Sequence, residues 1–200
     1  MKTALLSVYH KDGIVEFAKA LLQLPEEWRI ISSGGTYRAL VEGGVSARDI
    51  AEITGMGPIL DHRVVTLHPA IHGGLLATDE MKPELEALGF PWIDMVCVDL
   101  YPLREEIENS MSTPQSVLDK TDIGGPTMIR SAAKGGRIVI ARAEDRRLVL
   151  NWLARGRPDP ENTLNYLRAR AETIVADYCE TSHRYWYRNI DLAAIQALRM

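Results

Sequence analysis

Apolar residues fall in short runs separated by amphipathic stretches along much of this chain. Four runs have the length and composition of buried strands: TALLSV (3–8), EWRIISS (27–33), MVCVDLYP (95–102) and GRIVIA (136–141). Residues 13–24 follow the i, i+3, i+4 spacing of a helix with one apolar face, at Ile14, Phe17, Ala18, Leu21 and Leu22. A second helix is expected at 37–44. This alternation predicts an α/β fold, a parallel sheet with helices on both faces.

The last forty residues have a different pattern. Residues 161–200 are helical in composition and become aromatic toward the segment HRYWYRN. Forty residues are few for an independent domain, so we expect a single domain over 1–200. It would consist of an α/β core at 1–160 and a helical extension at 161–200 that packs on this core or on a second subunit.

Composition narrows the class of protein. The apolar fraction of 46% and the charged fraction of 25% are ordinary for a globular protein. A net charge of −4 argues against a general nucleic-acid binder but leaves small anionic ligands open. The chain has no run of about 18 apolar residues, no signal-peptide pattern at its start and no cysteine framework. We therefore expect a cytoplasmic protein without a membrane partner, in which Cys97 is a buried, reduced thiol.

Two loops follow predicted strands and could hold an anion. Residues 7–13 offer Ser7 and Lys11, and residues 32–36 offer two serines, two glycines and a threonine before a helix. Glycines allow close backbone approach, and hydroxyl and N–H groups donate hydrogen bonds to phosphate. The alternative is a pair of ordinary strand-to-helix turns with capping residues. Neither loop is a Walker motif or a dinucleotide fingerprint, so triphosphates and NAD have no support.

A third stretch, DIGGPTMIRSAAKGG (122–136), begins with an acid and continues as a predicted helix from near Gly125. Asp122 could simply interact with the helix dipole. Alternatively, Asp122 and either Lys134 or Arg130 could form an acid and base pair at one edge of a pocket.

The segment HRVVTLHPAIHGG (62–74) contains three of the five histidines. His68 and His72 have the i, i+4 spacing of zinc ligands, but Pro69 disfavours a helical His68 and two glycines follow His72. No third ligand stands at the right spacing. We therefore predict a loop that shapes a polar pocket rather than a metal site, with histidines bonded within a turn as the alternative.

Five ordered motifs give the chain a specific resemblance. SV-x-x-K-x-G, SGGT, RV-x-TLHP-x-IHGG, DLYP and DIGGPTMIR-x-AAK resemble the inosine monophosphate cyclohydrolase family over roughly residues 3–190. In that family this unit is usually the N-terminal domain of a bifunctional protein with a formyltransferase. The resemblance implies a three-layer, methylglyoxal-synthase-like α/β domain, which agrees with the alternation of strands and helices.

The resemblance also implies a reaction without metal or organic cofactor. The carboxamide nitrogen of a formamido-imidazole-carboxamide ribonucleotide attacks its own formyl carbon, and water leaves to give inosine monophosphate. Motif by motif, the catalytic roles fall on Tyr101, Asp122 and Lys134. The contacts to the nucleotide monophosphate fall on Ser7, Tyr9, His10, Lys11, Ser33, Gly34, Gly35, Thr36, Arg63, Val64, Val65, Thr66, Asp99, Ile123 and Gly124.

The chain departs from the family pattern at the substrate loops. Val65 stands where the family has a lysine, Tyr9 and His10 replace a serine and an aspartate, and Asp99 replaces an asparagine. These changes leave three functions open: the cyclohydrolase itself, a paralogue that closes the ring of a related nucleotide, or a binding module without catalysis. We expect a homodimer, because the aromatic segment HRYWYRN suggests a buried contact and the family is commonly dimeric, with packing of the tail helix within one chain as the alternative. A separate formyltransferase is a possible partner, because the chain ends near the expected limit of the cyclohydrolase domain.

Overall fold

The computed structural model describes residues 1–61 and 63–198. Five strands form one parallel sheet in the order β3-β2-β1-β4-β5. Their bounds are β1 Lys2–Ser7, β2 Trp28–Ser32, β3 Ala47–Asp49, β4 Met95–Val98 and β5 Ile138–Ile140. In the central pairings, Ala4 of β1 lies opposite Ile30 of β2 and Met95 of β4. The expected α/β class with a parallel sheet is confirmed.

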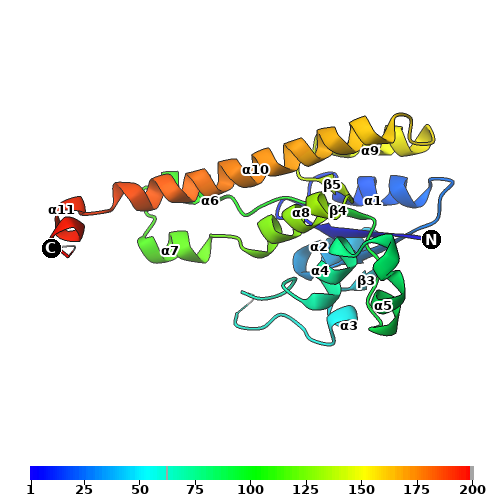
Figure 1. Cartoon of the computed structure of the whole chain (residues 1–200), viewed down its shortest axis with the longest axis horizontal. Helices are drawn as coiled ribbons and strands as arrows, with labels where there is room; N and C mark the ends of the chain where they lie inside the picture. Colours follow the sequence, from blue (N-terminus) through cyan, green and yellow to red (C-terminus); the bar gives the residue numbers. More distant parts are fainter. Residues whose placement is uncertain (62, 199–200) are drawn as a thin grey trace.

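Helices cover both faces of this sheet (Figure 1). On one side, α1 (Ile14–Leu22) contacts both α2 (Gly34–Glu42) and α9 (Asp145–Ala154). On the other side, α8 (Gly124–Lys134) packs on β4 and β5 and contacts α4 (Pro69–Leu76). The remaining short helices are α3 Ala51–Thr54, the 3-10 helix η1 Asp79–Met81, α5 Lys82–Ala87, α6 Leu103–Glu108, α7 Pro114–Asp119 and α11 Leu192–Ala197.

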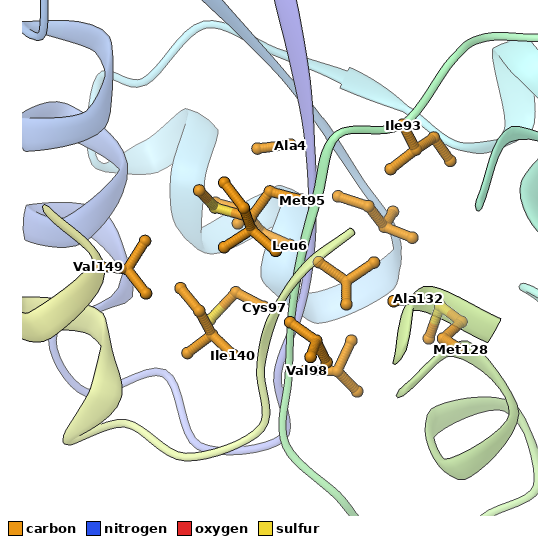
Figure 2. Close-up of a cluster of buried hydrophobic side chains, with 14 of the residues drawn as sticks. Ala4, Leu6, Ile93, Met95, Cys97, Val98, Met128, Ala132, Ile140 and Val149 are labelled. Carbon is orange, nitrogen blue, oxygen red and sulfur yellow. The ribbon is translucent and has the colours of Figure 1, made fainter. Parts of the chain in front are cut away.

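The core lies on both sides of β4. Its residues alternate in direction, so Cys97 meets Ile140 and the α9 residue Val149 while Val98 faces Met128 and Ala132 of α8 (Figure 2). Cys97 is 2% exposed, and burial raises the pKa of its thiol to about 11. Cys97 is thus a buried thiol, as its apolar run indicates.

The predicted C-terminal extension is the 29-residue helix α10 (Pro160–Arg188) followed by α11. Its first half packs on α8 and β5 through Leu167, Ala171 and Val175, and it also contacts α6. Figure 1 shows α10 running along one side of the molecule and continuing beyond the sheet to α11. Within the described part of the chain, no helix has the length and hydropathy needed to span a membrane.

Candidate functional site

The strand order places a crevice at the carboxyl ends of β1 and β4. The chain runs outward from β1 through β2 to β3 and then returns to the other side of β1 as β4. Ligands of open parallel sheets bind where the order reverses in this way, because the connecting loops diverge there. The loop after β1 carries Ser7 to Lys11, and the loop after β4 carries Asp99 to Tyr101. Two of the motifs singled out from the sequence therefore meet at this point.

One cavity of about 580 Å³ occupies this crevice. It is lined by most of the residues predicted to bind or to act on a substrate. These are Ser7, Tyr9, Lys11, Ser33, Gly34, Gly35, Thr36, Arg63, Val65, Thr66, Asp99, Tyr101, Asp122, Ile123 and Gly124. His10, Val64 and Lys134 are not among the lining residues.

The N-terminus of α2 forms one end of the cavity. Thr36 joins the loops after β1 and β2, because its hydroxyl accepts from the Val8 N–H at 3.0 Å and donates to the Val8 carbonyl at 2.9 Å. Ser33 is buried at the N-cap but makes no side-chain capping bond to the helix. The first N–H groups of α2 therefore face the cavity without a side-chain cap, which is a suitable arrangement for a phosphate.

Two cations lie at this helix end. A Cβ built on Gly35 would lie 3.4 Å from Lys11 Cε and 3.8 Å from a guanidinium nitrogen of Arg38. Lys11 Nζ donates to the carbonyls of Val8 and Tyr9. Burial is the largest influence on Lys11 and lowers its pKa, Asp99 opposes this effect, and Arg38 adds to it. Lys11, Arg38 and the α2 amides together can bind a dianion.

Asp99 fixes the loop after β1. Its two carboxylate oxygens accept from the backbone N–H groups of Tyr9 and His10, the second at 3.2 Å. The Tyr9 side chain contacts the Tyr101 ring at 5.4 Å between centroids, and Lys120 Nζ lies 5.8 Å from the Tyr9 ring. Tyr9 and Tyr101 therefore form an aromatic wall at the mouth of the cavity.

Asp122 lies at the N-terminus of α8, the helix that packs on β4 and β5. The Gly125 N–H donates to its Oδ1 at 2.9 Å. Burial raises the pKa of this carboxyl, backbone N–H donors of Gly125, Tyr101 and Gly124 act in the other direction, and Asp99 repels its charge. The pKa of Tyr101 is also raised, first by burial and then by Asp122 and Tyr9. A carboxyl with a raised pKa beside a phenol is suited to proton transfer.

The segment before α4 supplies the cavity's third side. Arg63 is exposed and pairs with Asp119 at 2.6 Å. Val64 does not line the cavity and forms an isolated antiparallel bridge with Ile59. Val65 packs against the hydrophobic core, and Thr66 is buried beside Gly124, where a Cβ would lie 2.7 Å from its hydroxyl.

Lys134 does not share a pocket edge with Asp122. It is the exposed last residue of α8, whereas Asp122 precedes the first residue of that helix. The 11 residues of α8 span about 15 Å along the axis. Within one chain the predicted acid and base pair is therefore wrong. The alternative partner Arg130 is exposed and pairs with Glu172 on α10.

Only the second half of the histidine segment departs from the loop that we expected: residues 63–68 form a loop, and helix α4 begins at Pro69. His68 is extended, as a residue before proline should be, and its Nδ1 accepts from the Ala70 N–H at 3.1 Å as the N-cap of α4. Gly74 is retained in the helix because a Cβ there would lie 3.1 Å from Ile93 and would strike the Pro91 carbonyl. His72 Nδ1 lies 3.0 Å from the Ser131 hydroxyl of α8. Both side chains thus hold α4, while His62 falls outside the described residues.

No group of three or more His, Cys, Asp or Glu is placed to hold a metal ion in residues 1–61 and 63–198. The cavity also contains charged residues that sequence reasoning missed, namely Arg38, Asp61 and Asp119. Arg38 had a usable signal, since it follows Gly34 and Gly35 by three to four residues at the start of a predicted helix. Asp61 and Asp119 had no such signal: they lie one and three residues before two of the segments singled out from the sequence, and their approach to the cavity depends on how the chain turns there.

Comparison with known proteins decides the family. The model of the MGS-like domain matches residues 13–127. This chain belongs to the MGS-like domain family. The predicted resemblance is confirmed at this level, and so is the three-layer α/β fold of the described residues.

Several relatives match more of the chain. It is 51% identical over 135 residues to the bifunctional purine biosynthesis protein PurH of Deinococcus deserti, covering 66% of this chain and 26% of that protein. It is 40% identical to the PurH protein of a Thermoanaerobacter strain, covering 98% of this chain and 40% of that protein. The chain thus spans well under half the length of these curated relatives. A solved structure, the crystal structure of ForH, superposes with a TM-score of 0.80 at 31% identity, covering 93% of this chain and 97% of that one.

Proposed function

We propose that this MGS-like domain is an enzyme of purine biosynthesis that closes the ring of a formamido-imidazole-carboxamide ribonucleotide. The carboxamide nitrogen forms a bond to the formyl carbon and gives up one of its two protons, the formamido nitrogen gives up its own proton, and the formyl oxygen leaves with these two protons as water. Inosine monophosphate is the product. This step changes no oxidation state, so it requires neither a redox cofactor nor a phosphoryl donor. The name of the PurH relatives supports the assignment to purine biosynthesis.

The main observation behind this proposal is that one cavity joins an anion site to a carboxyl with a raised pKa. The anion site is at the N-terminus of α2, which packs on β1, β2 and β3, and Asp122 with Tyr101 lies near the start of α8, which packs on β4 and β5. A nucleotide bound by its 5′-phosphate would present its base to Asp122. Asp122 would accept the amide proton during attack, and the Tyr101 hydroxyl would donate to the developing oxyanion. Holding the formyl group over the carboxamide supplies the remaining acceleration.

The first experiment measures ring closure by ultraviolet absorbance with the formylated ribonucleotide and with the matching nucleoside, which lacks phosphate. Wild-type chain should turn over the nucleotide much faster. Arg38→Met should weaken nucleotide binding by roughly 10-fold, as expected for a lost charge-assisted contact. It should leave the weak nucleoside reaction unchanged. An equal loss on both substrates would contradict the assignment of Arg38 to the phosphate.

A second candidate is a paralogue that closes the ring of a related nucleotide. Three observations favour this candidate. Apolar Val65 lines the cavity, Tyr9 forms the aromatic wall together with Tyr101, and the Asp99 carboxylate accepts backbone N–H groups of the loop after β1. Val65→Lys should then raise activity on the formamido-carboxamide substrate. Strong wild-type activity without any gain in the variant would reject this candidate. Tight binding of inosine monophosphate without turnover of any substrate would instead indicate a binding module.

We also propose a cytoplasmic homodimer formed through the end of α10 and α11. Large apolar side chains are exposed there, at Tyr187, Ile190, Leu192, Ile195 and Leu198. Sedimentation velocity should give twice the monomer mass, and Ile190→Asp should shift it toward monomer. A monomeric wild-type chain would contradict this proposal. A separate formyltransferase would supply the formylated substrate, as the resemblance to the cyclohydrolase family implies.

A further inference from the structure

Tyr178 on α10 contacts the loop that carries Asp122. Its hydroxyl accepts from the Asp122 N–H at 2.7 Å and donates to the Lys120 carbonyl at 3.1 Å. The hydroxyl thus bonds to both ends of residues 120–122, which lie in the connection between α7 and α8. Burial raises the pKa of Tyr178 to about 12, so this phenol keeps its proton at neutral pH. Tyr178 does not line the cavity.

The contact has a direct consequence for the carboxyl of Asp122. That side chain is already constrained at its oxygen end, where the Gly125 N–H donates to Oδ1. Tyr178 constrains the backbone end of the same residue. Asp122, which lines the cavity, is thus restrained both at its backbone N–H and at its carboxyl.

We propose that Tyr178 is a positioning residue for the reaction, and that it makes α10 part of the working site by holding Asp122. This inference rests on the proposed function, because it assumes that Asp122 acts on the substrate. The proposal gives the C-terminal extension a role in the reaction, in addition to its packing on α8 and β5. Tyr178 acts only through Asp122 and touches no substrate.

Tyr178→Phe is the test, because it keeps the ring and removes only the hydroxyl. The variant should lose turnover number by roughly 10- to 100-fold, the effect expected when a reacting group is misplaced by about 1 Å. The KM should stay within roughly twofold, because the anion site at α2 is untouched. The pH dependence of kcat/KM should also change. A loosened Asp122 is better solvated, so its pKa falls and the acid limb moves to lower pH.

Thr181→Val is the matched control on the same helix. It removes the hydroxyl that accepts from Arg104 of α6 at 3.2 Å, close to Tyr178 on α10, without touching residues 120–122. Its turnover number and pH profile should equal those of the wild type. Circular dichroism and thermal melting should show that both variants keep their helices.

The outcomes separate this inference from the proposed function. A wild-type chain that closes no ring would overturn the proposed function itself. An active wild type with a normal Tyr178→Phe variant would overturn the positioning role alone. An equal loss in Tyr178→Phe and Thr181→Val would also overturn it, since the effect would then come from docking of α10 in general.

Discussion

Asp99 places a negative charge between β1 and β4, and both of its oxygens accept backbone N–H groups of the loop after β1. Asp99→Asn keeps the shape but can accept only through one oxygen and removes the charge. Because Asp99 repels the Asp122 carboxylate, the pKa of Asp122 should fall in the variant. The acid limb of the kcat/KM profile should therefore move to lower pH. A shift to higher pH would contradict this electrostatic coupling.

Sequence reasoning found most of the residues around the cavity but did not predict the distances between some of their side chains. Ser33 to Thr36 and Lys11 could be predicted, because a strand followed by glycines and hydroxyls has a known place at the sheet edge. Lys134 could not be judged from its motif alone. Its distance from Asp122 depends on the unbroken length of α8, and the helix carries Lys134 away from the carboxyl. Asp119 is brought to the cavity only by the packing of α7.

The start of α8 is the element that positions Asp122, and it has no room for a Cβ. One built on Gly125 would lie 2.7 Å from Leu100 and would strike the Asp122 carboxyl. Gly125→Ala should therefore lower ring closure by roughly 100-fold through displacement of that carboxyl. It should cost about 1–3 kcal/mol of unfolding free energy through overpacking. Activity assays and chemical denaturation measure the two effects.

Gly73→Ala is the matched helical control. Gly73 lies inside α4, and a Cβ there would make an ordinary contact with Leu85 of α5, at 3.5 Å. The variant should keep full activity and gain up to about 1 kcal/mol from helix propensity. A comparable loss of activity in both glycine variants would show that the effect of Gly125→Ala is not specific to Asp122.

Elements were predictable where the apolar pattern was strong. The runs at 27–33, 95–102 and 136–141 contain β2, β4 and β5, and the run at 3–8 overlaps all of β1 except Lys2. The edge strand β3 was missed because ARD at 47–49 has three residues and no apolar run. Helix α4 was missed because Pro69 and two glycines normally mark a loop. There the proline occupies the first helical position, and the glycines permit close packing that propensity does not describe.

At the scale of the whole molecule, stability should depend on pH through His72. Burial between α4 and α8 lowers the pKa of this imidazole from its ordinary 6.5, and a contact with the Thr66 backbone opposes the shift. Near pH 6 the unfolded chain therefore binds a proton that the folded chain resists, so the free energy of unfolding falls as pH falls through 6.5.

His72→Asn should flatten that part of the profile, because asparagine can still bond to Ser131 but does not titrate. Denaturant titrations of the two proteins between neutral and mildly acidic pH measure the difference. Parallel profiles for wild type and variant would mean that another group causes the pH dependence.

The central claim is that the crevice between β1 and β4 binds a nucleotide monophosphate at α2 and uses Asp122 to close its ring. The most direct measurement compares wild type and Asp122→Asn for ring closure, followed by ultraviolet absorbance, and for binding of inosine monophosphate, followed by calorimetry. The wild type should turn over, and the variant should lose roughly 100-fold or more of that rate while binding the product with similar affinity. Equal turnover by the two proteins, or no turnover by the wild type, would contradict the claim.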